Sequence, residues 1–264
     1  MDTRGPTVPA HDPQLGGRLR GILVCFPAIA YTFVWSIVVL ILLSCFPRWS
    51  ATRWWGWLHR WGRFMLWLTG LRLETHGLER IAASSPCLVM FNHQSLLDLV
   101  ILATTWPAGA TVLYKREFHR IPFMGRAMRR AGMIPIDRSH QDAARESLAE
   151  AASEVREHGR VVLIAPEGTR SRRGGLQDFK LGPFHLACAT GVPILPFIVR
   201  GVAEVLPMGR FGPHTGTIRV DVPAPIDTTG WDATSVRDHA ADVRDVFLAW
   251  LPPAAGSATS GNAA

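Results

Sequence analysis

An imidazole and a carboxylate stand five positions apart at His93 and Asp98, directly after the apolar run of residues 87–91. Histidine is the side chain best suited to take up a proton near neutral pH. A carboxylate within reach fixes the tautomer of the imidazole and stabilises the imidazolium that forms, as in a catalytic triad. No obvious nucleophile accompanies the pair, so the pattern favours a base that activates a hydroxyl of the substrate.

The two side chains can meet only where the chain changes conformation between them. In one continuous helix, residues five apart point about 140° away from each other. We therefore expect a buried strand over residues 87–91, a turn at His93, and a helix that Ser95 caps and that holds Asp98 in its first turn. The alternative interpretation is that Asp98 merely caps the helix and His93 is an ordinary turn residue.

A loop rich in glycine and arginine follows another apolar run and spans residues 165–175. Glycine lets backbone N–H groups approach an anion, and arginine can bind a phosphate with two hydrogen bonds. Active sites of open α/β sheets favour the carboxyl ends of strands. The loop is a candidate phosphate site, with a basic surface loop as the alternative. Glu167 is less expected there, and it could order the arginines or accept a bond from a substrate hydroxyl.

Two more expected strands end in charged residues. Residues 115–125 begin with Lys115 and are rich in cations, which alone is weak evidence for substrate contact. Asp137 and Arg138 end another run. Arg138 could reach the same anion, or the two side chains could form a surface ion pair, and both interpretations stay open.

The composition limits the classes of partner. The chain has 264 residues, 48% of them hydrophobic, and a formal net charge of +7. This charge favours anionic partners such as nucleic acid, a phospholipid surface or a phosphorylated substrate. The four cysteines include no C-x-x-C pair, and no third ligand has suitable spacing to His93 and Asp98, which argues against zinc.

The N-terminal part predicts membrane association. Residues 1–20 form a polar leader, and no charged residue occurs over residues 21–47. As a helix, residues 22–46 would span roughly 37 Å, more than the ~30 Å hydrocarbon core of a bilayer. The run is too long for the apolar part of a signal peptide. A single span and a hairpin kinked at Pro27 remain alternatives.

Tryptophan and arginine dominate the segment that follows, with six of the ten tryptophans at positions 49–67. On a helical wheel one face holds Trp54, Trp57, Leu58, Trp61, Met65 and Leu68, and the other holds Arg53, His59, Arg60 and Arg63. The pattern is typical of a helix lying in the membrane interface. The alternative is an amphipathic helix packed on the protein core.

From residue 71 onward the chain reads as an α/β domain. Helices are expected over residues 141–158, with Ser139 as a possible N-cap and Gly159 as the stop, and over residues 236–251. Residues 252–264 are expected to be a disordered tail. The expected strands are 87–91, 110–114, 133–136, 161–165, 194–199 and 217–222.

Four ordered blocks over residues of about 75–225 resemble the 1-acyl-glycerol-3-phosphate acyltransferase family of the glycerolipid acyltransferase superfamily. Residues 92–98 look like its N-H-x-x-x-x-D block. Residues 115–138, 166–182 and 192–197 resemble its other three. Two positions depart from the family pattern, since Ala165 replaces a usual Phe and Phe118 a common Leu. The resemblance implies a mixed central sheet flanked by helices, behind an N-terminal membrane-associated segment at residues 21–70, with the acyltransferase domain at residues 71–251.

The resemblance also implies roles. His93 would act as general base on the sn-2 hydroxyl of a lyso-lipid acceptor, and Asp98 would orient it. The activated oxygen would attack an acyl thioester of coenzyme A or acyl carrier protein without an acyl-enzyme or a cofactor. The acceptor phosphate would contact Lys115, Arg138 and Arg170, and Glu167, Gly168 and Thr169 would complete that loop. The block at residues 192–197 would lie near the acyl donor, or simply form a core strand.

Alternatives at this level are the same chemistry on a lyso-ornithine lipid or a lysophospholipid, and a non-catalytic protein that binds anionic lipid. No nucleic-acid partner is expected. The catalytic domain is expected to face the cytoplasm, at the inner or plasma membrane if the source is bacterial.

Overall fold

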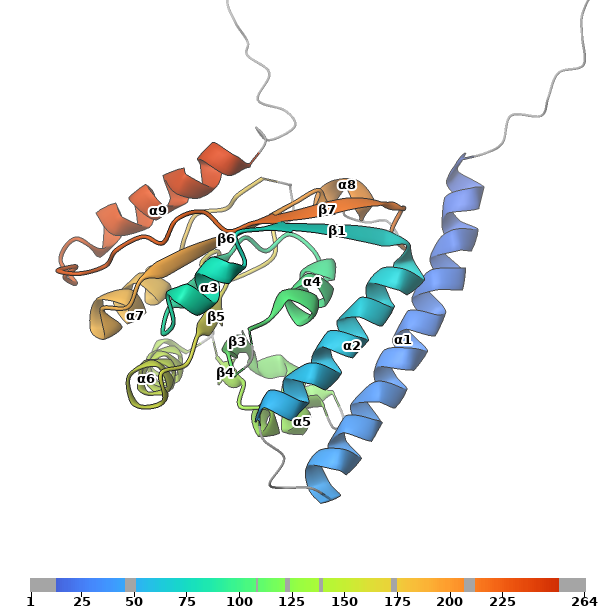
Figure 1. The fold of residues 1–264 in the computed structure, drawn as a ribbon, viewed down its shortest axis with the longest axis horizontal. Coiled ribbons are helices and arrows are strands. Elements are labelled where there is room, and N and C mark those ends of the chain that lie inside the picture. The colour runs from blue at the N-terminus through green and yellow to red at the C-terminus, as the bar shows by residue number, and fades with distance from the viewer. Residues whose placement is uncertain are drawn as a thin grey trace, which may run out of the picture.

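The computed structural model describes residues 13–45, 51–107, 109–121, 124–137, 140–171, 175–206 and 212–251. Its centre is a seven-stranded sheet in the order β1-β7-β6-β2-β5-β3-β4 (Figure 1). The strands are β1 (Leu71–His76), β2 (Leu88–Phe91), β3 (Thr111–Lys115), β4 (Ile134–Ile136), β5 (Val162–Ile164), β6 (Ile194–Arg200) and β7 (Gly216–Asp221).

The sheet is mixed, as expected. The strands from β6 to β4 in this order run parallel, while β7 pairs antiparallel with β6 and parallel with β1. All six expected strands are present with bounds shifted by one residue at most. The sequence reading missed β1, an edge strand whose only fully buried residue is Leu71.

Helices cover both faces of the sheet (Figure 1). They are α1 (Pro13–Cys45), α2 (Ala51–Thr69), α3 (Glu79–Ala83), α4 (Leu97–Thr105), η1 (Arg116–Arg120), α5 (Met124–Arg130), α6 (Gln141–His158), α7 (Gly182–Thr190), α8 (Val202–Val205) and α9 (Val236–Trp250). The expected helix over residues 141–158 has these bounds, and Gly159 ends it with φ +60°. Ser139 lies outside the described residues, as do Arg138 and the expected tail at 252–264.

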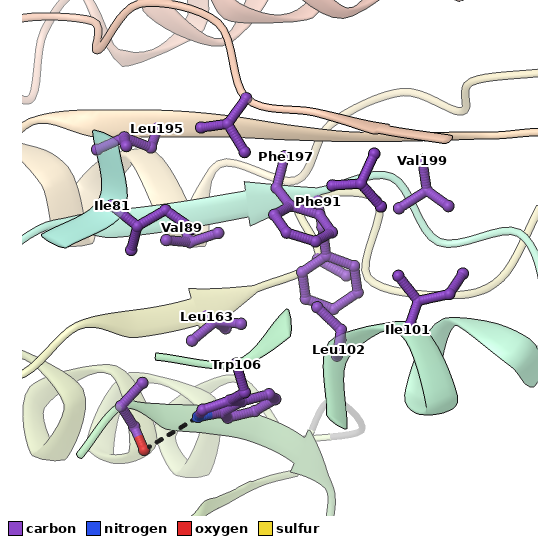
Figure 2. Close-up of a cluster of buried hydrophobic side chains, with 14 of the residues drawn as sticks. Ile81, Val89, Phe91, Ile101, Leu102, Trp106, Leu163, Leu195, Phe197 and Val199 are labelled. Carbon is purple, nitrogen blue, oxygen red and sulfur yellow. Dashed lines mark hydrogen bonds between the residues drawn. The ribbon is translucent and has the colours of Figure 1, made fainter. Parts of the chain in front are cut away.

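Alternating side chains of the central strands build two separate cores. In β2, Val89 packs on the side of α2 and α4, where Figure 2 shows it with Leu163 and Phe197. Its neighbours Leu88 and Met90 pack on the side of α6, α7 and α9. A strand buried on both faces reads as a continuous apolar run, which is why these strands were recognisable from sequence. Residues 194–197 of the fourth block lie in this interior.

Helices α1 and α2 form an antiparallel pair on one side of the sheet, with α1 on the outside (Figure 1). Their rings meet at Tyr31 and Phe64, with centroids 4.1 Å apart, and Trp61 Nε1 donates to Thr32 Oγ1 at 3.2 Å. Helix α1 already begins within the expected leader. It continues through Pro27, so the hairpin kinked at Pro27 is wrong, and the reversal falls between α1 and α2.

Helix α1 has the length and composition of a membrane span. Its segment Arg20–Leu42 has 23 residues and a mean hydropathy of 2.2. Only 6% of its most apolar stretch is buried within the protein. Large apolar side chains such as Phe26 and Phe33 are exposed on it.

Helix α2 packs the predicted apolar face on protein, and it also packs Trp55 and His59, which the helical wheel did not place there. Trp55 is 2% exposed and stacks on Trp106 with centroids 4.9 Å apart. His59, expected on the polar face, instead contacts the Trp106 carbonyl oxygen through Nε2 at 2.8 Å. Trp61 and Met65 pack against the pair α1 and α4. The alternative interpretation, an amphipathic helix packed on the protein core, therefore describes α2. Aromatic residues lie on several sides of the helix, and tertiary contacts decide which of them are buried.

Candidate active site

The site begins where β2 ends, at the centre of the sheet. The carboxamide of Asn92 donates through Nδ2 to the Val199 carbonyl oxygen at 2.8 Å and accepts the Val199 N–H through Oδ1 at 2.7 Å. Asn92 is fully buried. Its side chain thus replaces the peptide group that the next residue of β2 would have offered to β6. The backbone is released to turn out of the sheet at His93.

The turn brings His93 against the start of α4. His93 Nδ1 lies 2.7 Å from Asp98 Oδ2, and Asp98 is 1% exposed. The same oxygen accepts the backbone N–H groups of Gln94 and Ser95, both at 2.8 Å. Asp98 therefore reaches back over the helix start as the acid of a capping box does, and also holds His93. Asp98 thus both caps this turn and contacts His93, and the catalytic role of the pair stays a prediction.

The helix start differs from the prediction in one detail. Helix α4 begins at Leu97, with Leu96 at the N-cap position and no side-chain cap there. Ser95 lies one residue earlier, where its Oγ accepts the N–H of Leu97 at 3.3 Å. Asp98 is thereby the main acceptor for the backbone of this turn.

The contact with Asp98 determines which nitrogen of His93 can act. A carboxylate only accepts hydrogen bonds, so Nδ1 carries the proton and Nε2 carries the lone pair. The His93 side chain is 23% exposed, which leaves it accessible beyond the carboxyl end of β2. Asp98 Oδ1 is buried and has no hydrogen-bond partner among the described residues. The pair has the geometry of an oriented general base.

The loop after β5 lies beside this turn, because β5 is the parallel neighbour of β2. Glu167 is 2% exposed, and its Oε1 accepts the His93 N–H at 2.8 Å while Oε2 accepts the Gln177 N–H at 2.9 Å. Burial raises the pKa of Glu167, and these backbone donors oppose the rise. Both carboxylate oxygens therefore contact the backbone, and the arginine or substrate contact considered from sequence stays a prediction.

The residues that follow Glu167 differ in exposure, and Ser171 is only 4% exposed. Gly168 has φ +74°, and a Cβ there would lie 3.2 Å from the Lys180 side chain, which explains the requirement for glycine. Thr169 and Arg170 are exposed. Ser171 turns the chain back, since its N–H donates to the His93 carbonyl oxygen at 2.9 Å.

The other expected cations follow neighbouring strands. Lys115 ends β3, which pairs parallel with β5, so it lies at the same edge of the sheet as His93. Its side chain is 56% exposed and forms an ion pair with Glu117 at 3.0 Å. Asp137, after β4, contacts Arg116 at 3.5 Å. Arg138 follows it outside the described residues.

Sequence reasoning did not anticipate the partners of Asn92 and Glu167. Those partners lie 107 and 74 positions away along the chain. The available signal was their polar character beside apolar runs, since a buried polar side chain needs a partner. Among the described residues, no group of three or more His, Cys, Asp or Glu is arranged to hold a metal ion.

Comparisons with known proteins agree with this arrangement. The profile of the family described as Acyltransferase matches residues 72–200. The 1-acyl-sn-glycerol-3-phosphate acyltransferase of Limnanthes douglasii is 31% identical over 233 residues, 88% of this chain and 82% of that protein. The protein of the same name from Pseudomonas aeruginosa is 34% identical over 206 residues, 76% of this chain and 78% of that protein.

A solved structure has the same fold. The crystal structure of the 1-acyl-sn-glycerophosphate (LPA) acyltransferase PlsC from Thermotoga maritima superposes with a TM-score of 0.70. The match covers 89% of this chain and 97% of that chain, at 22% sequence identity. The mixed sheet and its helical layers are therefore shared.

Proposed function

Because the chain belongs to the 1-acyl-sn-glycerol-3-phosphate acyltransferase family and is an acyltransferase, we propose that it acylates the sn-2 hydroxyl of 1-acyl-glycerol-3-phosphate. The product is phosphatidic acid. The acyl donor is a thioester of coenzyme A or acyl carrier protein, and no cofactor takes part.

The contact between His93 and Asp98 carries the proposal. Nδ1 is held at 2.7 Å from a buried carboxylate, so the neutral, partly exposed ring presents the lone pair of Nε2. Nε2 takes the proton of the sn-2 hydroxyl while the oxygen attacks the thioester carbon. The C–S bond breaks as the ester bond forms, and His93 returns the proton to the leaving thiolate. The acyl group passes directly between substrates, with no acyl-enzyme.

The acceptor phosphate is assigned to the cationic edge of the sheet. The exposed side chains of Arg170 and Lys115 follow β5 and β3, the first and second strands beyond β2 on that side. Thr169 and the left-handed Gly168 give the loop its shape, and Arg138 follows the next strand. Arginine suits a phosphate because its guanidinium can donate two parallel hydrogen bonds.

The N-terminal helices support a reaction at a membrane surface. The exposed apolar surface of α1 matches a lipid environment, and α2 joins it to α4, the helix that holds Asp98. A lipid acceptor then reaches His93 from the bilayer surface. The catalytic domain faces the cytoplasm, at the inner membrane if the source is bacterial.

An acyl-transfer assay with purified protein in lipid vesicles tests the proposal. Two acyl donors are compared, the acyl thioester of coenzyme A and that of acyl carrier protein. As acceptors, 1-acyl-glycerol-3-phosphate is compared with a lysophospholipid and a lyso-ornithine lipid. We expect the phosphomonoester to be preferred. Preference for another lyso-lipid contradicts the acceptor assignment and leaves the chemistry intact.

The base is tested with His93→Ala. We expect turnover to fall by about 10²–10⁴-fold, the usual contribution of a general base. Circular dichroism and vesicle flotation serve as controls for folding and membrane binding. Full turnover in this variant contradicts the role of His93, and loss of activity in a chelator contradicts the absence of a metal.

A further inference from the structure

Both backbone polar groups of His93 are bound by the loop that carries Arg170. The N–H donates to Glu167 Oε1 at 2.8 Å, and the carbonyl oxygen accepts the Ser171 N–H at 2.9 Å. The ring is bound separately through Nδ1 to Asp98 at 2.7 Å. Three contacts therefore determine where Nε2 points, and two of them come from the loop after β5.

Glu167 connects His93 to the far end of the same loop. Its second oxygen accepts the N–H of Gln177 at 2.9 Å, so one buried carboxylate joins two separate segments of backbone. Burying a carboxylate is unfavourable, and bonds from two N–H groups offset that cost. The raised pKa of Glu167 agrees with this environment. Each of its two oxygens accepts a backbone N–H, and the side chain is 2% exposed, so its position is determined by the protein backbone.

From these contacts we infer that Glu167 is a positioning residue: it fixes the backbone of His93 relative to the loop of Arg170, so that the base and the bound acceptor keep one mutual geometry. The inference rests on the proposed function. It assigns Glu167 to turnover, whereas Arg170 is assigned to acceptor binding. A displacement of about 1 Å in such an arrangement lowers the rate of reaction by about 10²-fold.

Glu167→Gln is the most selective change, because the shape is kept and one acceptor is lost. A carboxamide has one oxygen and one NH2 group, so either His93 or Gln177 faces a donor with its own N–H. Glu167→Asp keeps both acceptors on a side chain that is one methylene shorter. We expect kcat to fall by about 10–100-fold in the Gln variant and less in the Asp variant. The KM values for acceptor and donor should stay within about twofold of wild type, whereas Arg170→Ala should raise the acceptor KM.

Thr111→Val provides a control for general destabilisation. Thr111 is fully buried, and its Oγ1 donates to the Gly132 carbonyl oxygen at 2.6 Å. It begins β3, so it lies at the amino end of that strand, whereas His93 follows the carboxyl end of the parallel strand β2. Thermal unfolding by circular dichroism ranks all variants, and we expect Thr111→Val to lose stability while kcat stays within about twofold.

Three results overturn the inference. These are an acceptor KM that rises in Glu167→Gln as it does in Arg170→Ala, wild-type kcat in Glu167→Gln, and an equal loss of kcat in Thr111→Val at equal loss of stability. A wild-type protein that transfers no acyl group to any lyso-lipid overturns the proposed function itself, and the inference with it. The first three results leave the proposed function standing, so the two failures are distinguishable.

Discussion

The side chain of Asn92 and the peptide group of Val199 exchange two hydrogen bonds, at 2.8 and 2.7 Å, although 107 positions separate them. The pair closes the ladder between β2 and β6 without using the backbone of Asn92. The turn at His93 can begin at the next residue for this reason.

Asn92→Asp tests this arrangement. The carboxylate still accepts the Val199 N–H, but it places a second oxygen against the Val199 carbonyl in a fully buried site. We expect a loss of about 2–3 kcal/mol in the free energy of unfolding, because a buried carbonyl loses its donor and a charge is buried. Urea denaturation measures the loss. Stability equal to wild type would show that the carboxamide does not act as a donor.

Asp98→Asn tests the orientation of the imidazole. The amide keeps the size of the carboxylate, and its one oxygen can still accept from Nδ1, Gln94 and Ser95, but the negative charge is lost. We expect kcat to fall by about 10²–10⁴-fold, since the imidazolium that forms as His93 takes up the proton loses its charged partner. Steady-state kinetics measure the effect. Unchanged kcat contradicts an orienting role for Asp98.

Two glycines of α2 form a matched pair. A Cβ at Gly62 would lie 2.6 Å from Thr104 Oγ1 and 3.0 Å from the Thr104 backbone nitrogen, whereas Gly56 has open space. Gly56→Ala should stabilise the protein by about 0.5–1 kcal/mol through helix propensity. Gly62→Ala should destabilise it, because α2 and α4 must separate. Thermal unfolding in detergent compares them, and equal shifts in Tm would show that the helices are not in close contact.

The thiol of Cys87 should be inert in the folded protein. It is fully buried, and burial raises its pKa to about 12. The thiolate is the reactive species, so iodoacetamide at pH 8 should leave Cys87 unmodified until the chain unfolds. Peptide mass spectrometry reads the modification, with the partly exposed Cys188 as the internal comparison. Rapid labelling of Cys87 in the native state contradicts its place in the core.

The raised pKa of Glu167 predicts a dependence of stability on pH. Burial disfavours its carboxylate, so the folded state binds this proton more tightly than the unfolded state. The stability from this proton is present below the ordinary glutamate pKa of about 4.3 and is lost as pH rises through the raised value. The unfolding free energy of wild type relative to Glu167→Gln should therefore fall with rising pH. Urea titrations from acid to neutral pH measure it, and a rise in place of the fall contradicts the prediction.

Local pattern was sufficient for six of the seven strands and for the contact between His93 and Asp98. Apolar runs such as residues 194–199 are buried on both faces and so carry no competing signal. His93 and Asp98 meet within one turn and the start of one helix, which short-range geometry determines. The helix Gln141–His158 was predictable because its stripe and its glycine stop are local.

Tertiary structure alone decided the partners of the groups around that pair. Asn92 bonds to β6 and Glu167 to the His93 backbone because the sheet order places β2 between β6 and β5, and strand order is not encoded in any short segment. The orientation of α2 was decided likewise. Its aromatic residues lie on several faces, so the contacts of Trp55 with Trp106 and of Trp61 with Thr32 select the buried ones. Periodicity is a property of a single element, whereas burial is a property of the assembled chain.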